Sequence, residues 1–359
     1  MPSMIQPAIP GIKAAMITSS RITTRVLTSG RYDGIPVLFL HGNLSSAAWW
    51  EGTMASLPSG YRGIAPDQRG FGDADRSARI DATRGMRDLA EDAVALLDAM
   101  SVAQAHIVGM SLGGSVMWQM LMDFPGRFLT ATLAAPGSPY GAGGTRDADG
   151  TPCFGDYAGS GAGLINRKLV RNLRAGDRST NDLFSPRTVL RTLVVRPGCI
   201  PEHEEELLTG MLGIHVGELE YPGDVAVSSN WPYVAPGRWG ATNALSPKYA
   251  GDIARLFLID PMPGILWIRG SDDLAVSDSS SSDPGRLGQV GLIPDWPGMD
   301  IYPPQPSILQ TRAVLERYAA AGGIYKEVVI PDCGHVPFIE KPGEANAVFH
   351  RHILPAPDS

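Results

Sequence analysis

Cysteine is scarce in this chain of 359 residues, which holds only Cys153, Cys199 and Cys333. The three lie far apart and form no C-x-x-C pair. Because zinc sites and disulfide frameworks need numerous or closely spaced cysteines, the sequence predicts neither kind of site. We expect the three thiols to be reduced, as they are in cytosolic proteins.

Long apolar runs and an excess of positive charge are also missing. No stretch approaches the run of about 18 apolar residues that a membrane span needs, and residues 1–11 lack the charged-then-apolar order of a signal peptide. The formal net charge is −7 and the pI is near 5.5, which leaves no basic face for a phosphate backbone. We therefore expect a cytoplasmic protein with no membrane span and no nucleic-acid partner.

The composition that is present suits a large globular core. Apolar residues make up 43% of the chain and charged residues 19%. A length of 359 residues exceeds what one compact core usually needs. We therefore expect one core domain that carries insertions.

Apolar segments alternate with amphipathic ones along the chain. Residues 85–100 place apolar side chains on one stripe at helical spacing and the carboxylates of Asp88 and Asp92 elsewhere, which predicts a helix covering one face of a sheet. A second helix is predicted from residue 112 to about 124. The predicted strands span residues 14–18, 22–28, 36–40, 105–109, 129–135, 264–269 and 324–330. This alternation indicates an α/β fold with a mostly parallel sheet between helical layers.

The pentapeptide 109–113, Gly-Met-Ser-Leu-Gly, stands between a predicted buried strand and a predicted helix. Because the chain contains 42 glycines, a G-x-S-x-G pattern can arise by chance and is weak evidence of a nucleophile by itself. At a strand-to-helix turn, however, such a pattern pushes the serine hydroxyl out beyond the edge of the sheet. Its position therefore makes Ser111 a candidate nucleophile.

Other polar side chains follow neighbouring strands in the same way. The residues placed directly after a predicted strand, or a few positions beyond it, include Asn43, Ser111, Asp273 and His335. In parallel sheets, ligands bind beyond the carboxyl ends of the strands. The sequence therefore predicts that these groups meet at one edge of the sheet.

Three further segments complete a family pattern. Residues 37–43 are similar to an oxyanion-loop strand, residues 66–72 to a D-x-R-G-x-G turn, and residues 335–342 to a histidine loop. Asp73 stands where a serine is common, a departure that touches no catalytic group. With the chain order serine, acid, histidine, the segments resemble the α/β-hydrolase superfamily, and in particular its capped serine esterase-like members.

The resemblance covers about residues 20–136 and 262–354 and stops in between. It implies a mostly parallel α/β-hydrolase sheet flanked by helices, with a core of residues 1–136 and 260–359. The intervening residues 137–259 are expected to form a large, mainly helical cap. Substrate choice is expected to be decided in this middle segment.

The resemblance assigns roles to three side chains. Ser111 is expected to be the nucleophile and His335 the general base, because a hydroxyl at neutral pH needs a base with a pKa near 7. Asp273 is expected to orient and stabilise the imidazole. Asp272 competes for that role, although the family's usual spacing of flanking glycine and apolar residues favours Asp273.

The carbonyl oxygen of a substrate gains negative charge during attack and needs two N–H donors. One is expected from Leu112, which directly follows the nucleophile. The other is expected from Asn43 or Leu44. His41, close by, is expected to hold the turn by hydrogen bonding and to take no part in the chemistry.

The middle of the chain offers weaker signals. The glycine runs 141–144 and 159–163 lack the context of a phosphate-binding loop and are expected to be flexible connections. The acidic run 202–206 is expected to be a solvated helix start, because consecutive helical residues cannot converge on one metal ion. A second insertion, residues 277–304, is expected to overhang the site. The candidate substrate-binding side chains are Met110, Trp231, Trp296 and Tyr302.

These features predict a serine hydrolase that cleaves a small, apolar carboxylic ester or lactone through an acyl-enzyme on Ser111, with no cofactor and no metal. A carbon–carbon bond hydrolase or a perhydrolase using the same triad is an alternative, as is a non-catalytic small-ligand receptor. A receptor needs no nucleophile, which weighs against the last. Serine in place of aspartate disfavours the epoxide hydrolase and haloalkane dehalogenase branches. A homo-oligomer is compatible with the sequence.

Overall fold

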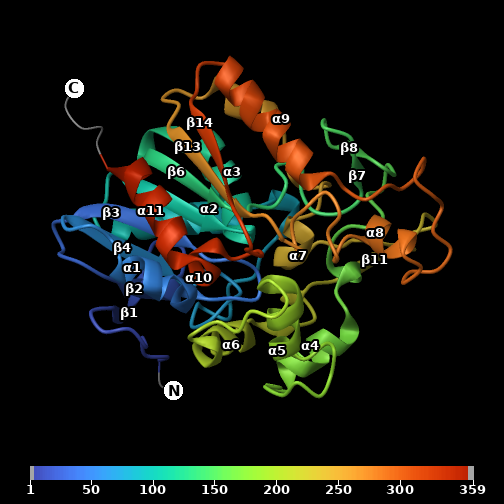
Figure 1. Ribbon diagram of the computed structural model, residues 1–359, viewed down its shortest axis with the longest axis horizontal. Coiled ribbons are helices and arrows are strands. Elements are labelled where there is room, and N and C mark those ends of the chain that lie inside the picture. The colour runs from blue at the N-terminus through green and yellow to red at the C-terminus, as the bar shows by residue number, and fades with distance from the viewer. Residues whose placement is uncertain (1–3, 355–359) are drawn as a thin grey trace.

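The computed structural model describes residues 4–354, so the outermost residues of the predicted core, 1–3 and 355–359, lie outside the described part. An eight-stranded sheet runs through the molecule in the order β1-β2-β4-β3-β5-β6-β13-β14 (Figure 1). Its strands are β1 Lys13–Thr18, β2 Thr23–Thr28, β3 Ile35–Leu40, β4 Tyr61–Pro66, β5 Ala105–Met110, β6 Phe128–Ala134, β13 Gly264–Gly270 and β14 Tyr325–Ile330.

The sheet is mostly parallel. Strands β1 and β2 form an antiparallel hairpin, and β2 pairs antiparallel with β4. From β4 to β14 every neighbouring pair is parallel. The predicted α/β fold is therefore confirmed. The seven predicted strands differ from the observed ones by only a residue or two at their ends, whereas β4 was not predicted. The parallel arrangement brings the ends of β3, β5, β13 and β14 to one edge, where the loops carrying the candidate residues begin.

Helices cover both faces of the sheet. On one face α1 contacts α11, which packs on β6 and β13, while on the other α3 packs on β5 and against α2. Figure 1 shows α11 in front of the strands and α3 behind them. The helices of the core are α1 Glu51–Ala55, α2 Arg87–Ala99, α3 Leu112–Asp123, α9 Ser307–Ala320, α10 Pro337–Glu340 and α11 Pro342–Ile353.

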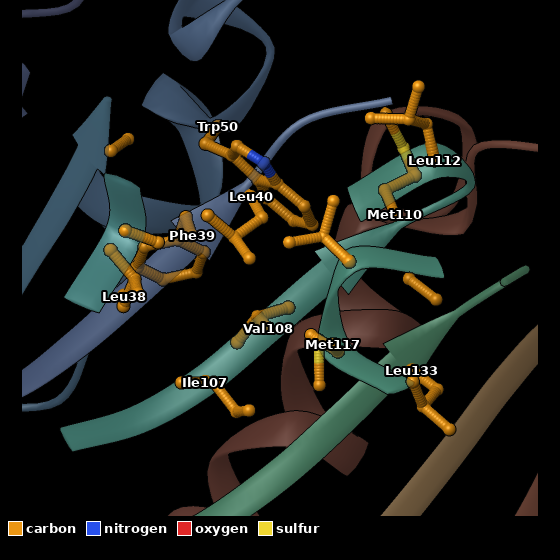
Figure 2. Packing of buried hydrophobic residues seen from close by; sticks show 14 of the residues in the cluster. Leu38, Phe39, Leu40, Trp50, Ile107, Val108, Met110, Leu112, Met117 and Leu133 are labelled. Carbon is orange, nitrogen blue, oxygen red and sulfur yellow. The ribbon is translucent and has the colours of Figure 1, made fainter. Parts of the chain in front are cut away.

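The centre of the sheet is apolar on both faces, as expected for strands covered by helices on each side. Leu38, Leu40 and Val108 are completely buried, and Figure 2 shows them in one cluster with Met110, at the end of β5, and Leu112, at the start of α3. Phe39 packs against Trp50 with ring centroids 5.2 Å apart. The turn after β5 is therefore anchored in the buried apolar core.

A buried ion pair fixes the loop after β4. Asp67 receives two hydrogen bonds from the guanidinium of Arg25, at 2.8 and 3.2 Å, and neither side chain is exposed. The Asp67 oxygens also accept the backbone N–H groups of Ala47 and Asp73, each at 2.9 Å. One carboxylate therefore joins β2, β4 and the segment that follows β3.

A second charged cluster lies on α2. Arg69 binds the carboxylate of Asp92 through two nitrogens, at 2.6 and 2.7 Å, and Arg21 binds Asp92 and Asp88. Asp88 and Asp92 lie off the apolar stripe, as the periodicity predicts, yet both are buried by these arginines. The polar side of α2 is therefore packed against the β1–β2 hairpin and the loop after β4.

Residues 137–259, the predicted cap, combine helices with short strands. The strands form three two-stranded sheets, β7 with β8, β9 with β10, and β11 with β12. The helical elements are α4 Arg167–Arg174, α5 Pro186–Val189, a π-helical turn Leu190–Val194, α6 Glu204–Leu212 and α7 Ala241–Ala244. The strands are β7 Thr145–Arg146, β8 Thr151–Pro152, β9 Val216–Gly217, β10 Tyr221–Pro222, β11 Val225–Val227 and β12 Val234–Pro236. The second insertion contains α8 Pro284–Gln289.

The glycine runs of the cap are packed, which corrects the expectation of flexible connections. The hydroxyl of Tyr302 donates to the carbonyl of Gly159 at 2.8 Å. Gln305 accepts from the N–H of Gly143 at 2.7 Å and donates to the carbonyl of Gly141 at 2.9 Å. Both glycine runs therefore serve as close contact surfaces for the second insertion and the segment after it.

The acidic start of α6 is also less solvated than expected. Glu204 is buried and pairs with both Arg187 and Arg191 of the preceding helical segment. These arginines hold the pKa of Glu204 below its ordinary value, through hydrogen bonds first and charge second, against the opposing effect of burial. Glu204 therefore joins two helical segments of the cap, while the other residues of the run 202–206 are exposed, as expected.

We predict that Asp67→Asn lowers the free energy of unfolding by about 3–5 kcal/mol, because it leaves the Arg25 guanidinium buried without a counter-charge. Urea unfolding followed by circular dichroism measures the change. Asp33→Asn is the matched control, since Asp33 pairs with Arg31 at the surface, where their side chains are 69% and 84% exposed. An Asp67→Asn transition as stable as that of the control contradicts the prediction.

Candidate active site

Ser111 lies on a strained turn between β5 and α3. Its φ is 54°, in the left-handed region that side chains rarely adopt. A Cβ atom at Gly113 would lie 2.2 Å from the carbonyl oxygen of Leu40, and one at Gly109 would lie 2.5 Å from that of Gly113. Only glycine fits at these two positions, because the start of α3 packs directly on the end of β3 and on the end of β5.

This turn leaves the serine at the surface of the core. Ser111 is partly exposed, whereas its neighbours Met110 and Leu112 are buried. Its backbone N–H donates to the carbonyl of Ala134 at 3.0 Å, at the end of the adjacent strand β6. A Cβ atom at Gly42 would lie 3.1 Å from the Cβ of Ser111. The loop after β3 therefore lies against the serine.

Asp273 and His335 are joined by a hydrogen bond. The Nδ1 atom of His335 lies 2.8 Å from Oδ2 of Asp273, and both residues are buried. The other oxygen, Oδ1, accepts the backbone N–H groups of Ala275 and Val276, each at 2.8 Å. Because Asp273 is an acceptor, Nδ1 carries the proton. The carboxylate is thus fixed from one side and aims at the imidazole from the other.

Asp272 points elsewhere. Its carboxylate pairs with Arg196 of the cap at 2.8 Å, and its side chain is 42% exposed. Adjacent residues that leave a strand point in different directions. Of the two acids that the sequence leaves in competition, Asp273 is the one that faces His335.

The electrostatic surroundings of His335 act in opposite directions on its pKa. Burial disfavours the charged imidazolium and lowers the pKa, while the charge and hydrogen bond of Asp273 and the charge of Glu340 raise it. The net effect is a pKa above the ordinary value of 6.5. The carboxylates therefore outweigh the cost of holding a charged ring in the interior.

No hydrogen bond joins the Ser111 hydroxyl to His335 among those of residues 4–354. The Nδ1 atom is engaged by Asp273, so Nε2 is the nitrogen left to receive a proton. Catalytic hydrogen bonds are often long before substrate binds. The structure therefore pairs the acid with the histidine and places the serine after β5 on the same sheet edge.

Three backbone N–H groups are candidates for an oxyanion site. The N–H of Leu44 donates to the side-chain oxygen of Asn43 at 3.0 Å. Within the described part of the chain, no acceptor faces the N–H groups of Asn43 and Leu112. Leu112 begins α3, where the helix dipole adds positive potential. The two unengaged donors are therefore those of Asn43 and Leu112.

His41 is a structural residue of this loop. It is completely buried, its Nδ1 lies 2.9 Å from the carbonyl oxygen of Gly42, and its Nε2 accepts the N–H of Gln68 at 3.0 Å. Burial lowers its pKa to about 4, so the ring is neutral. His41 thus ties the loop after β3 to the loop after β4.

Three of the four candidate substrate-binding residues form a cluster between the cap and the second insertion. The rings of Trp231 and Tyr302 meet edge to face at 4.8 Å. Trp231 donates to the carbonyl of Pro294 at 2.8 Å, and Trp296 donates to that of Tyr302 at 2.9 Å. Met110 lies beneath the serine, with its methyl group near Gly42. The substrate-binding role of these side chains stays a prediction.

Sequence reasoning missed one cap residue at the site. Tyr221 of β10 is buried, and its phenol contacts the side chain of Asn43. Burial raises the pKa of Tyr221 strongly, and the contact with Asn43 opposes this only in part. The cap thus reaches the loop that carries a candidate oxyanion donor. No motif surrounds Tyr221 in the sequence, so nothing there indicated this position.

Residues 4–354 contain neither a cluster of metal-ligating side chains nor a membrane-spanning helix. That region holds no group of three or more His, Cys, Asp or Glu side chains arranged to bind a metal. It also has no helix with the length and apolarity needed to cross a bilayer. Burial raises the pKa of the Cys153 thiol to about 12 and that of Cys333 still further. These two thiols are therefore protonated at neutral pH.

Comparison with known proteins points to one fold. The family model described as the alpha/beta hydrolase fold matches residues 35–151. Carboxylesterase YbfK of Bacillus subtilis is 32% identical over 117 residues, which cover 33% of this chain and 39% of that protein. Rhodomycin D methylesterase DauP of Streptomyces sp. strain C5 is 37% identical over 128 residues, covering 34% and 42%. The chain spans about two fifths of the length of the curated relatives it matches.

Solved structures extend the likeness to nearly the whole chain. The crystal structure of carboxylesterase CesB (YbfK) from Bacillus subtilis aligns with a TM-score of 0.57 and 14% identity, covering 95% of this chain and 91% of that one. A thermophilic esterase from Thermogutta terrifontis gives 0.54 and 17%, covering 94% and 97%. At such identities the likeness concerns the fold alone. The sheet topology, the family model over residues 35–151 and these structures therefore agree on the alpha/beta hydrolase fold.

Proposed function

We propose that the protein is a serine hydrolase that cleaves a carboxylic ester through an acyl-enzyme on Ser111. The observation that carries the proposal is the 2.8 Å hydrogen bond between His335 and Asp273, located at the sheet edge where the strained turn presents Ser111. Relatives named carboxylesterase and methylesterase support the same reaction class. A lactone is an internal ester and falls within the proposal.

In the proposed first half-reaction, the Ser111 oxygen attacks the carbonyl carbon while its proton passes to Nε2 of His335. Asp273 stabilises the imidazolium that forms. The tetrahedral intermediate then collapses, the bond to the alcohol oxygen breaks, and the imidazolium gives its proton to the departing alcohol. The products are an alcohol and an acyl-serine.

In the second half-reaction, water replaces the alcohol. His335 takes a proton from the water, whose oxygen attacks the acyl carbon. Collapse of the second intermediate returns the proton to the Ser111 oxygen and releases the carboxylic acid. Because every proton transfer uses one imidazole, the reaction needs no further cofactor.

The negative oxygen of both intermediates is proposed to bind the N–H groups of Leu112 and Asn43. These donors are fixed by the backbone before substrate arrives, which favours the transition state over the ground state. Loss of one such donor typically costs about 10²–10³-fold in kcat. The N–H of Leu44 is left out of the proposal, because the side chain of Asn43 already engages it at 3.0 Å.

Fluorophosphonate labelling tests the nucleophile directly. We expect wild-type protein to be labelled with unit stoichiometry and to hydrolyse p-nitrophenyl esters, and we expect Ser111→Ala to lose both properties. Ser115→Ala is a matched control on the first turn of α3, since Ser115 is buried and lies outside the proposed site. Labelling of Ser111→Ala, measured by intact-protein mass spectrometry, contradicts the proposal. Labelling of wild type without turnover of esters or lactones favours carbon–carbon bond cleavage.

The two adjacent acids give a second test. Asp273→Asn should lower kcat by about 10⁴-fold, because the amide no longer holds the productive tautomer of His335. Asp272→Asn should lower it by less than about fivefold, since it loses only a surface ion pair. Steady-state hydrolysis of one ester measures both effects. Equal losses in the two variants speak against Asp273 as the orienting acid.

The pH profile gives a third test. His335 acts as a base only when neutral, and its pKa lies above the ordinary value of 6.5. The acid limb of kcat/KM should therefore have its midpoint above that value, with activity lost as pH falls through it. Asp273→Asn removes both the charge and the hydrogen bond that raise the pKa, so its residual activity should show a midpoint shifted to lower pH. A profile centred below the ordinary imidazole value argues against His335 as the base.

A further inference from the structure

The loop around His335 is held by one carboxylate. Glu340, at the end of α10, turns back so that its Oε2 accepts the N–H of Gly334 at 3.0 Å and its Oε1 accepts the N–H of Val336 at 3.2 Å. The residues on both sides of His335 therefore donate to the same side chain. Hydrogen bonds to a charged acceptor are about twice as strong as neutral ones.

The cap supplies the remaining contacts of this loop. The N–H of His335 itself donates to the carbonyl of Val194 at 3.0 Å, and the N–H of Arg196 donates to Oε2 of Glu340 at 2.7 Å. A Cβ atom at Gly334 would lie 2.5 Å from the backbone nitrogen of Arg196. The backbones of the cap and of the histidine loop are therefore in direct contact.

The side chain of Arg196 extends the junction to the acid loop. Its Nε lies 2.8 Å from the carboxylate of Asp272, and its Nη2 lies 3.2 Å from that of Asp332. Asp272 directly precedes Asp273, and Asp332 comes shortly before His335. One cap residue thus bridges the two loops that carry the acid and the base.

We propose that Glu340 is a positioning residue for His335, and that Arg196 connects it to the cap, so that docking of the cap sets the orientation of the imidazole. This inference rests on the proposed function, because an orientation matters only if His335 works on a nucleophile. The backbone donors of residues 334, 335 and 336 all have fixed acceptors. Rotation of the loop would break these hydrogen bonds together.

Glu340 also acts on His335 through its charge. Of the groups around the ring, burial lowers the pKa of His335, Asp273 raises it most, and Glu340 raises it further. The thiol of Cys333 lies beside Glu340 and is protonated, because burial raises its pKa. Arg196 faces Asp272 and Asp332. Removal of the Glu340 charge should therefore lower the pKa of His335.

Two substitutions of Glu340 separate the effect of its charge from its effect on the orientation of His335. Glu340→Gln keeps the shape but loses the charge, and it turns an amide N–H₂ toward backbone donors. Glu340→Asp keeps the charge but is too short to reach the N–H groups of Gly334, Val336 and Arg196 together. We expect kcat for ester hydrolysis to fall by about 10²-fold in each variant, since small misplacements of a catalytic group have that effect, with KM little changed. The pKa of His335 should fall in Glu340→Gln and stay close to wild type in Glu340→Asp.

The pKa is measured by NMR titration of the His335 ring, assigned with a His335→Gln sample, so this readout does not depend on turnover. Glu327→Gln is the matched control, since Glu327 is a partly buried carboxylate on β14 that pairs with Arg269 and Arg312. We expect the control to keep the kcat and the His335 pKa of wild type. If Glu340→Gln does not fold, as judged by circular dichroism, the kcat of Glu340→Asp decides the proposal.

Arg196→Ala tests the link to the cap. The side chain is 46% exposed, so the variant should fold, and we expect a loss in kcat of less than about fivefold. In combination with Glu340→Gln the loss should be smaller than the product of the single losses, because both act through one loop. Glu340 variants that match Glu327→Gln in kcat and in the His335 pKa overturn the proposal. Absence of labelling and turnover in wild type instead overturns the proposed function.

Discussion

The close approach between the end of β3 and the start of α3 controls the geometry of this molecule's candidate site. Gly113 lies so near to Leu40 that no side chain fits between them. Ser111, two residues before Gly113, has a positive φ of 54°, and it is more exposed than its neighbours Met110 and Leu112. The apolar strands beneath are completely buried, so the strain is held by many packing contacts. The position of the candidate nucleophile is thus a product of core packing.

Charged side chains fix the loops that surround this turn. The carboxylate of Asp67 holds the loop after β4 through Arg25, while Asp273 and Glu340 hold the loops near His335. Each carboxylate combines backbone N–H donors with one charged or titratable partner. One side chain that accepts several backbone N–H groups ties those parts of the loop together. The same kind of carboxylate interaction therefore stabilises the fold and sets the electrostatics of the candidate site.

Local sequence patterns predicted much of the fold and several residues of the candidate site. The G-x-S-x-G turn, the helix at residues 85–100 and the apolar strands depend on neighbours within a few residues, and the structure has them where they are expected. Burial of Asp92 depends on Arg21, which lies 71 positions away, so no local pattern contains it. The strands of the cap are two or three residues long, too short for any periodicity. Contacts such as that of Tyr221 with Asn43 depend on how the cap packs, which no motif encodes.

The cap is attached to the core at several separate points. Trp49 donates to the carbonyl of Leu207, Gly72 donates to that of Gly213, and His335 donates to that of Val194. These points lie in the loops after β3, β4 and β14. A hinged swing of the whole cap would have to release all of them at once. Residues 137–259 are thus tied to three loops of the core at once, so that movement of one segment alone leaves the other ties in place.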